Sequence, residues 1–371
     1  MTLAIVGGGL AGATAAAELR EQGYDGPVVL YAAEHHLPYE RPPLSKGFLL
    51  GRDPQDRMYV HDAAWYADHG IDLRLGTPVT AITPEDHLLR TSAGTEPYTR
   101  LLLAMGAYPR RLALADETGV PAAYLRTVED SVRLRAAFAQ RPRVAIVGAG
   151  WIGLEVAAAA REAGCEVAVH DLTDLPLRSV LGPEVAQVFA DLHRAHGVDL
   201  VLGSPVSAAA LAAADLVVVG IGAIPEISLA QAAGLLIANG ILVDAQLRTS
   251  DPDIYAVGDV ANHAHPVLGR VRSEHWDNAI EQAKTAARNM LGGDEPYARQ
   301  PYFFTDQYDL GMEYFGHVGP HSYDTVVIKG DTKSAFRAYW ERNGTVVAAM
   351  HANDWDASDE LRASIGAASK G

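Results

Sequence analysis

The chain has 371 residues and a mass of 39.5 kDa, which is enough for two or three domains and excludes a single small binding module. Its content of 49% hydrophobic and 20% charged residues is typical of a soluble globular protein and excludes a mostly disordered chain. The net charge of −16 argues against non-specific nucleic-acid binding, because neutralising phosphates requires a surplus of lysine and arginine.

The single cysteine, Cys165, excludes disulfide frameworks, iron–sulfur ligation and all-cysteine zinc sites, so we expect no metal centre. Any redox chemistry must then use a bound organic cofactor. No basic and apolar leader precedes the first strand-like run, and the most apolar stretch, 216–219, is too short to span a membrane. We therefore expect a cytoplasmic enzyme with neither membrane nor nucleic-acid partners.

The chain begins with the signature of a dinucleotide-binding unit. The run 3–6 is apolar without alternation, as in a buried parallel strand, and the glycine-rich turn 7–12 follows it at once. Residues 13–22 are predicted to form a helix and 27–31 a second strand. This order of strand, turn, helix and strand is the context in which a glycine fingerprint is informative.

The same order returns in the middle of the chain. A predicted strand at 144–147 leads into the turn 148–153, a helix through Ala163 and a strand at 166–170. Two such units in one chain are much stronger evidence than one glycine motif alone.

The glycines of the two turns are expected to serve the same function, which is the binding of a pyrophosphate. They let the backbone approach a pyrophosphate closely, while the following helix supplies N–H groups and the positive end of its dipole. Tight helix–strand packing without a ligand is the alternative, and the duplication disfavours it. The glycines are Gly7, Gly9 and Gly12 in the first turn and Gly148, Gly150 and Gly153 in the second.

Asp171 ends the second strand of the second unit, where a dinucleotide fold places the carboxylate that binds the adenine ribose. No arginine follows it in Leu172 to Asp174 to receive a 2′-phosphate. The second unit therefore predicts NAD rather than NADP, and a solvated strand-end aspartate is the alternative.

Two further strand ends, 101–106 and 254–259, bracket the second unit, which suggests that it is inserted into the first. Asp259 follows the later strand and Gly258, where a carboxylate can hold the ribitol chain of a flavin. Together with the first dinucleotide unit, it favours FAD.

From Pro301 onward the sequence changes to short alternating runs, with Asn343-Gly344 as a hairpin signal and a helix near 358–365. We predict an α/β fold with two Rossmann-like dinucleotide-binding domains and a small C-terminal α+β domain. The predicted domains are an FAD domain at 1–110 and 244–300, an inserted NAD domain at 111–243, and a C-terminal domain at 301–371.

Four stretches of the sequence resemble the FAD-dependent, NADH-using ferredoxin reductases of the putidaredoxin reductase, rubredoxin reductase and apoptosis-inducing factor type. The resemblance runs from Leu3 to about Ile365, and the string Arg-Pro-Pro-Leu-Ser-Lys makes it specific. It also implies the overall fold of the glutathione-reductase-like enzymes. The stretches are 38–46, 150–155, 250–259 and 274–279.

The resemblance implies that Lys46 and Glu155 form a catalytic ion pair beside the flavin and nicotinamide, and that Arg41 also contacts the flavin. A surface lysine and a helix-face glutamate are the alternatives from the residues alone. A charged pair at a desolvated cofactor face is reasonable because each charge offsets the burial cost of the other. Further cofactor-contacting positions implied are Glu34, Met105, Gly106, Gly258, Asp259, Glu274, His275, Trp276, Phe304, Trp151, Ile152 and Gly222.

The chain departs from the family pattern at several of these positions. Ala33 stands where the family has an acid, with Glu34 one residue later, so the contact to the FAD adenine ribose is shifted or lost. Met105 stands where a threonine is usual, and Phe304 where many members have tryptophan. The segment 204–214 replaces a longer β-meander.

These observations predict an enzyme that takes a hydride from NADH onto FAD and passes single electrons to a small acidic iron–sulfur ferredoxin serving an oxygenase. Ser45 lies where related disulfide and peroxide reductases carry a redox-active cysteine, which excludes those activities. Two alternatives stay open: NADH-dependent reduction of a small molecule such as a quinone, and NADH sensing with partner binding. We expect a monomer or homodimer.

Overall fold

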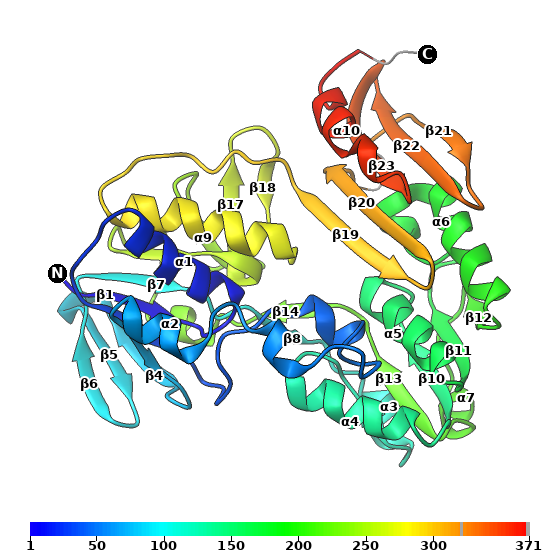
Figure 1. The fold of residues 1–371 in the computed structure, drawn as a ribbon, viewed down its shortest axis with the longest axis horizontal. Coiled ribbons are helices and arrows are strands. Elements are labelled where there is room, and N and C mark those ends of the chain that lie inside the picture. Colours follow the sequence, from blue (N-terminus) through cyan, green and yellow to red (C-terminus); the bar gives the residue numbers. More distant parts are fainter. Residues whose placement is uncertain (320–321, 369–371) are drawn as a thin grey trace. The chain divides into compact units, whose positions relative to one another are not determined.

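The computed structural model describes residues 1–319 and 322–368, which form two compact units (Figure 1). The first unit contains 1–40, 55–108 and 224–301, and the second contains 41–54, 109–223 and 302–371. This grouping puts 41–54 and the C-terminal segment with the second dinucleotide unit. The boundaries of the three predicted domains remain a prediction.

A five-stranded parallel sheet forms the centre of the first unit, in the order β16-β7-β1-β2-β3. Its central strands are buried, apart from Arg100 at the start of β7, as expected from their apolar runs without alternation. The strands are β1 (Leu3–Val6), β2 (Val28–Tyr31), β3 (Ile71–Arg74), β7 (Arg100–Leu103) and β16 (Ile254–Ala256).

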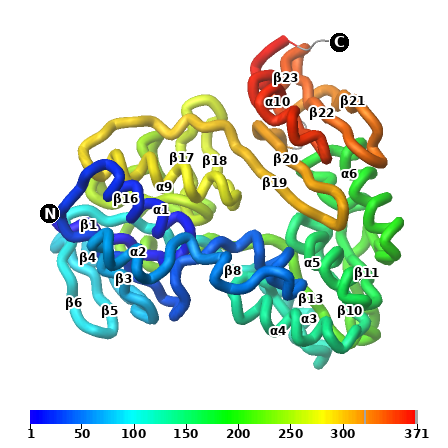
Figure 2. Tube along the Cα trace, viewed as in Figure 1, coloured from blue at the N-terminus to red at the C-terminus, as the bar shows by residue number. Residues whose placement is uncertain are grey.

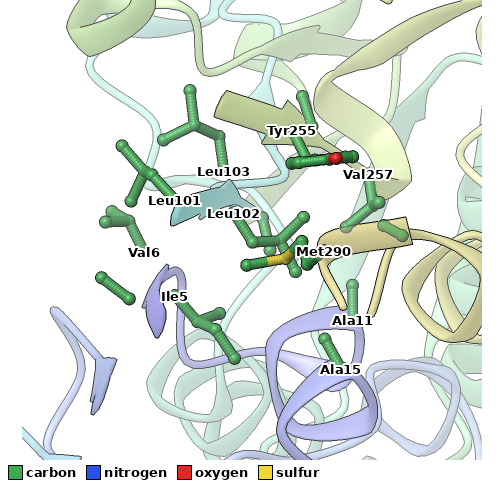
Figure 3. Packing of buried hydrophobic residues seen from close by; sticks show 14 of the residues in the cluster. Ile5, Val6, Ala11, Ala15, Leu101, Leu102, Leu103, Tyr255, Val257 and Met290 are labelled. Atoms are coloured by element: carbon green, nitrogen blue, oxygen red, sulfur yellow. The ribbon is translucent and has the colours of Figure 1, made fainter. Parts of the chain in front are cut away.

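Helix α1 (Leu10–Glu21) packs beside α9 (Trp276–Met290), as Figures 1 and 2 both show. Alanines on α1 and residues such as Leu102, Tyr255 and Met290 fill the core beside the sheet (Figure 3). The other elements of this unit are α2 (Ala63–Asp68), α8 (Ser228–Ala232), β4 (Val79–Thr83), β5 (Leu88–Thr91), β6 (Gly94–Pro97), β15 (Ile241–Val243), β17 (Ala261–His265) and β18 (Gly269–Val271).

The second unit has its own five-stranded parallel sheet, in the order β12-β11-β10-β13-β9. The strands are β9 (Ala122–Ala123), β10 (Arg143–Val147), β11 (Glu166–Asp171), β12 (Asp199–Leu202) and β13 (Leu216–Val219). The helices are α3 (Ala113–Glu117), α4 (Val128–Phe138), α5 (Trp151–Glu162), α6 (Arg178–Ala195) and α7 (Ala208–Ala212).

The C-terminal part of the second unit is an antiparallel sheet in the order β19-β20-β23-β22-β21, with α10 (Ser358–Ser364) packed against β23. Trp340, on β22, is fully buried. The strands are β19 (Tyr302–Gln307), β20 (Leu310–Gly316), β21 (Thr325–Asp331), β22 (Ala335–Arg342) and β23 (Thr345–Ala352).

The structure confirms the predicted fold class and most predicted elements. The first helix begins at Leu10 rather than Ala13, because Gly9 of the glycine turn is already its N-cap. The shortened segment before β13 contains α7, with Ser207 as its N-cap. The strands β8 (Ala107–Pro109) and β14 (Ala223–Pro225) lie where the chain passes between the units.

Cys165 lies in the core of the second unit, with its Sγ 3.7 Å from the carbonyl oxygen of Phe138. Burial raises the pKa of this thiol. Within the described part of the chain, no helix combines the length and the hydropathy that crossing a membrane would need.

Candidate functional site

Of the three fingerprint glycines in the first turn, Gly7 and Gly12 are required by packing and Gly9 faces open space. A Cβ on Gly7, which has φ of 125°, would lie 2.2 Å from the carbonyl oxygen of Ala104, and one on Gly12 would lie 2.0 Å from that of Gly7. A Cβ on Gly9 would meet nothing within 4 Å. The open position is the one where a dinucleotide fold brings the pyrophosphate against the backbone.

The second glycine turn repeats this arrangement. Added Cβ atoms would lie 2.3 Å from the Gly220 oxygen at Gly148 and 2.0 Å from the Gly148 oxygen at Gly153, but nothing lies within 4 Å at Gly150. Glycine is the N-cap of both following helices, so no cap side chain occupies their first N–H groups. Both turns therefore fit the pyrophosphate of a dinucleotide.

Asp171 connects the end of β11 to the second glycine turn. Its carboxylate accepts the backbone N–H of Ala149 at 2.7 Å and that of Thr173 at 2.8 Å, and the Thr173 hydroxyl donates to it at 2.7 Å. These donors hold the half-buried carboxylate beside the fingerprint, where a ribose hydroxyl of NAD can reach it.

The predicted flavin-binding residues around Gly258 lie in the first unit. Gly258 has φ of 72° and donates its N–H to the side chain of Gln282 at 2.9 Å. Arg272 donates to the carbonyl oxygen of Asp259 at 3.1 Å and to the carboxylate of Glu274 at 2.7 Å. This network fixes the backbone of Asp259 directly after the buried strand β16.

Glu34 follows β2 and accepts the Tyr39 hydroxyl at 2.7 Å, while Ala33 is exposed. Tyr39 is buried, so it anchors the carboxylate that stands one residue after the usual position. Burial raises the pKa of the neighbouring Glu40, and a hydrogen bond with Trp276 opposes that effect.

The remaining predicted positions of the first unit lie at element ends. Gly106 has φ of 72° and accepts the N–H of Glu226 at 2.9 Å; Met105 beside it is half-buried. His275 is the N-cap of α9, and Trp276 is the first residue of that helix.

The predicted catalytic pair comes together inside the second unit. Lys46 Nζ lies 2.7 Å from a carboxylate oxygen of Glu155, although the two residues are far apart in the sequence. The side chain of Glu155 is 3% exposed, so its charge needs a partner. The hydroxyls of Ser45 and Thr305 also donate to this carboxylate, the latter at 2.6 Å.

The local sequence explains this geometry. Pro42 and Pro43 begin the 3₁₀ helix 42–45, whose end places Ser45 and Lys46 side by side. Glu155 lies on the buried face of α5, one turn after the fingerprint. Lys46 Nζ also lies 5.7 Å from the ring centroid of Phe304, within the range of a cation–π interaction.

The other predicted positions of the second unit lie at the start of α5, in the segment before the 3₁₀ helix 42–45, and directly before β14. The Arg41 guanidinium donates to the carbonyl oxygen of Arg126, and Trp151 packs on Phe303 with ring centroids 4.4 Å apart. Ile152, the second residue of α5, is 47% exposed. Gly222 is exposed with φ of 100°.

Three residues beside the catalytic pair were not predicted: Thr305, Gln307 and His193. Thr305 and Gln307 alternate on β19, and two buried polar residues at that spacing on a strand are a signal that the sequence carries. His193 follows Phe189 by four residues on α6, so helical periodicity places it on the buried face. Among the residues that the structure describes, no cluster of potential metal ligands is found.

The chain matches two family models, pyridine nucleotide-disulphide oxidoreductase over residues 1–283 and reductase C-terminal over residues 302–370. It is 44% identical to the ferredoxin–NAD(+) reductase component of an anthranilate 1,2-dioxygenase system from Burkholderia cepacia, covering 94% of this chain and 90% of that protein. It is 39% identical to a 5,5′-dehydrodivanillate O-demethylase ferredoxin reductase subunit from Sphingobium, covering 93% and 88%.

Among solved structures, that of a covalent putidaredoxin reductase–putidaredoxin complex matches with a TM-score of 0.91. The identity is 34%, and the match covers 97% of this chain and 92% of that chain.

Proposed function

This chain belongs to the ferredoxin reductases of the pyridine nucleotide-disulphide oxidoreductase family, which use FAD and NADH, and from this premise we propose that it supplies electrons to an oxygenase. It accepts a hydride from NADH and delivers the two electrons singly to a small acidic iron–sulfur ferredoxin. The oxygenase is of the P450 or Rieske type. The protein works in the cytoplasm as a monomer or homodimer.

One observation carries the proposal: two dinucleotide cradles occur in a chain without a redox-active thiol. The second glycine of each fingerprint faces open space, and the single cysteine, Cys165, is buried with a raised pKa. A disulfide reductase needs reactive cysteines to take electrons from the flavin. In this chain the electrons have no thiol relay, which favours direct transfer to an external acceptor.

The flavin, when bound, supplies the change from two-electron to one-electron chemistry. Gly9 and the start of α1 would hold its pyrophosphate, and Asp259 its ribitol chain. Gly150 and the start of α5 would hold the NADH pyrophosphate, with Asp171 on the adenine ribose. These assignments rest on the open glycine positions, on the anchored carboxylate of Asp171 and on the fixed backbone of Asp259.

The role of Lys46 and Glu155 is to orient the reacting rings and to balance charge beside them. Their 2.7 Å ion pair is shielded from water on the Glu155 side, so it is electrostatically stronger than a surface pair. A fixed pair of opposite charges at the reacting rings contributes by positioning and by preorganised electrostatics.

The test is NADH-dependent reduction of cytochrome c with and without a panel of ferredoxins. Strong dependence of the cytochrome c reduction rate on an added ferredoxin is the expected result. Direct quinone turnover without a ferredoxin would instead favour a small-molecule reductase. Flavin that NADH reduces but that turns over no acceptor would favour NADH sensing.

A further inference from the structure

A continuous chain of buried polar side chains leads away from Glu155 on the side opposite to Lys46. The Thr305 hydroxyl lies 2.6 Å from one oxygen of Glu155, and Gln307 Nε2 lies 3.2 Å from that hydroxyl. Gln307 Oε1 in turn lies 2.8 Å from Nε2 of His193 on α6. Thr305, Gln307 and His193 are each at most 1% exposed.

The direction of each hydrogen bond in this series of side chains follows from the Glu155 carboxylate. An anion only accepts, so the single proton of the Thr305 hydroxyl points to Glu155. The Thr305 oxygen can then only accept, which makes the Gln307 amide nitrogen the donor to it. The Gln307 oxygen must accept from His193, so Nε2 of His193 carries the proton.

Burial lowers the pKa of His193 to about 4, with the hydrogen bond to Gln307 opposing, so the ring is neutral near pH 7. A neutral ring has one N–H, and the network assigns it to Nε2. Nδ1 is buried without a hydrogen-bond partner. Burying Nδ1 without a hydrogen bond lowers the free energy of unfolding, so this histidine destabilises the fold at that atom.

Packing alone does not require a histidine here. The buried face of α6 around it is otherwise formed by residues such as Val185, Phe189 and Ala190, all fully buried. An apolar side chain at position 193 would continue that face without an unpaired nitrogen. What the histidine adds is a donor directed along the chain toward Glu155.

We propose that Thr305, Gln307 and His193 are positioning residues that hold the Glu155 carboxylate toward Lys46 by three donations in one direction. Hydrogen bonds aligned in series polarise one another, and the last of these, from the hydroxyl to the carboxylate, is charge-assisted. This inference rests on the proposed function, because it assigns the three residues to the orientation of the predicted catalytic pair.

The first test compares two substitutions of Thr305 that separate the hydroxyl from the methyl group. Thr305→Val keeps the shape and removes the donor, and Thr305→Ser keeps the donor. We expect NADH to bleach the flavin of Thr305→Val at least about tenfold more slowly at saturating NADH under anaerobic conditions, with the serine variant within about threefold of the unsubstituted protein. Equal rates in the valine and unsubstituted proteins would overturn the proposal.

The second test asks whether His193 acts through Glu155. His193→Met removes the donor, and His193→Gln places an amide nitrogen near the position of Nε2. We expect the methionine variant to be slowed and the glutamine variant to be rescued. In a Glu155→Leu background, His193→Met should cause no further slowing, because the group being positioned is gone. An equal slowing in both backgrounds would mean a merely structural role and would overturn the proposal.

A third measurement needs no turnover. Long-range ¹H–¹⁵N spectra of the flavin-bound protein at pH 7 should show His193 as the neutral Nε2–H tautomer, with a resonance that Thr305→Val shifts. An Nδ1–H tautomer or a charged ring would overturn the assignment. Melting temperatures show which variants fold, so that only folded ones are compared. Flavin bleaching uses no ferredoxin, so a failure of the proposed acceptor would leave these results intact.

Discussion

The indole N–H of Trp340 donates to the carbonyl oxygen of Leu181 over 3.0 Å, and this bond joins the C-terminal sheet to α6 of the same unit. Both residues are fully buried. Leu181 directly precedes a break in α6, where Gly182 has φ of 76° and Pro183 follows. The C-terminal segment is thus held to α6 by a directional bond as well as by apolar packing.

Trp340→Phe should destabilise the second unit by about 2–4 kcal/mol, because it removes a buried hydrogen bond and leaves a cavity beside Leu181. Urea unfolding, followed by circular dichroism, measures this change. Trp355→Phe is the matched control, since Trp355 is 56% exposed, and should change stability by less than about 0.5 kcal/mol. Similar losses in both variants would contradict the anchoring role.

Alanine substitutions at the fingerprint glycines should distinguish effects on ligand binding from effects on fold stability. Gly9→Ala and Gly150→Ala have open space for the methyl group and negative φ, so the apoprotein should keep its stability within about 1 kcal/mol. Gly9→Ala should lower flavin occupancy, and Gly150→Ala should weaken NADH binding with flavin retained. Titrations followed by absorbance and calorimetry measure both effects.

The matched controls are Gly12→Ala and Gly153→Ala, whose methyl groups would lie 2.0 Å from backbone oxygens. These variants should lose fold stability before any ligand is added. Unchanged ligand affinity in Gly9→Ala and Gly150→Ala would contradict the pyrophosphate assignment.

Asp171→Ala should raise the NADH KM at least about tenfold, because it removes the carboxylate that we propose binds the adenine ribose. It also removes the acceptor of the Ala149 N–H, so disorder of the glycine turn adds to the loss. Asp174→Ala is the control, since this exposed aspartate pairs with Arg178 instead. Equal efficiency with NADPH in the unsubstituted enzyme would contradict the NAD assignment.

Lys46→Met and Glu155→Gln should each slow the reduction of flavin by NADH, because each leaves the partner charge stranded in a desolvated site. The double variant should lose less than the sum of the two single losses. Stopped-flow absorbance under anaerobic conditions isolates this step from acceptor chemistry.

Arg52 and Glu162 form a more exposed ion pair in the same unit and provide a control cycle, in which we expect small and additive effects. Strictly additive losses at Lys46 and Glu155 would show that these two residues are not coupled.

Acid should destabilise the first unit partly through His263. Burial lowers the pKa of this histidine to about 4, below the value of about 6.5 that it has in an unfolded chain. Below pH 6.5 the unfolded state therefore binds more protons, and the stabilisation is lost as the pH falls from 6.5 toward 4. The difference between the two pKa values corresponds to about 3 kcal/mol.

His263→Gln should reduce this loss, because glutamine does not titrate in this pH range. Its amide can still donate to the carbonyl oxygen of Tyr297, which lies 3.3 Å from Nε2 of the histidine. Unfolding free energies at pH 7 and pH 5 measure the difference, with the exposed His69→Gln as control. An unchanged pH dependence in His263→Gln would contradict the prediction.

Much of the fold could be predicted because local patterns determine it. The buried strands are continuous apolar runs, the glycine turns require positive φ or close packing, and Asn343-Gly344 forms the turn between β22 and β23. These signals lie within a few residues of each other. They do not depend on how distant segments pack.

The candidate site was harder to predict because distant segments build it. The contact between Lys46 and Glu155 depends on where a proline-initiated 3₁₀ helix meets α5, and only the family resemblance indicated it. The alternation of Thr305 and Gln307 on β19 and the helical spacing of His193 on α6 indicate burial, but they do not indicate which groups these side chains contact. Their roles emerge only when the donors and acceptors of all three elements are assigned together.

The buried position of Cys165 has a practical consequence for tracing the electron acceptor. A thiol that is fully buried and has a raised pKa reacts slowly with maleimides, and the chain has no other cysteine. A cysteine introduced at an exposed position such as Leu172 or Trp355 would therefore be the one readily labelled site. Photo-crosslinkers placed singly in this way can map where a ferredoxin docks without first rebuilding the protein as a cysteine-free variant.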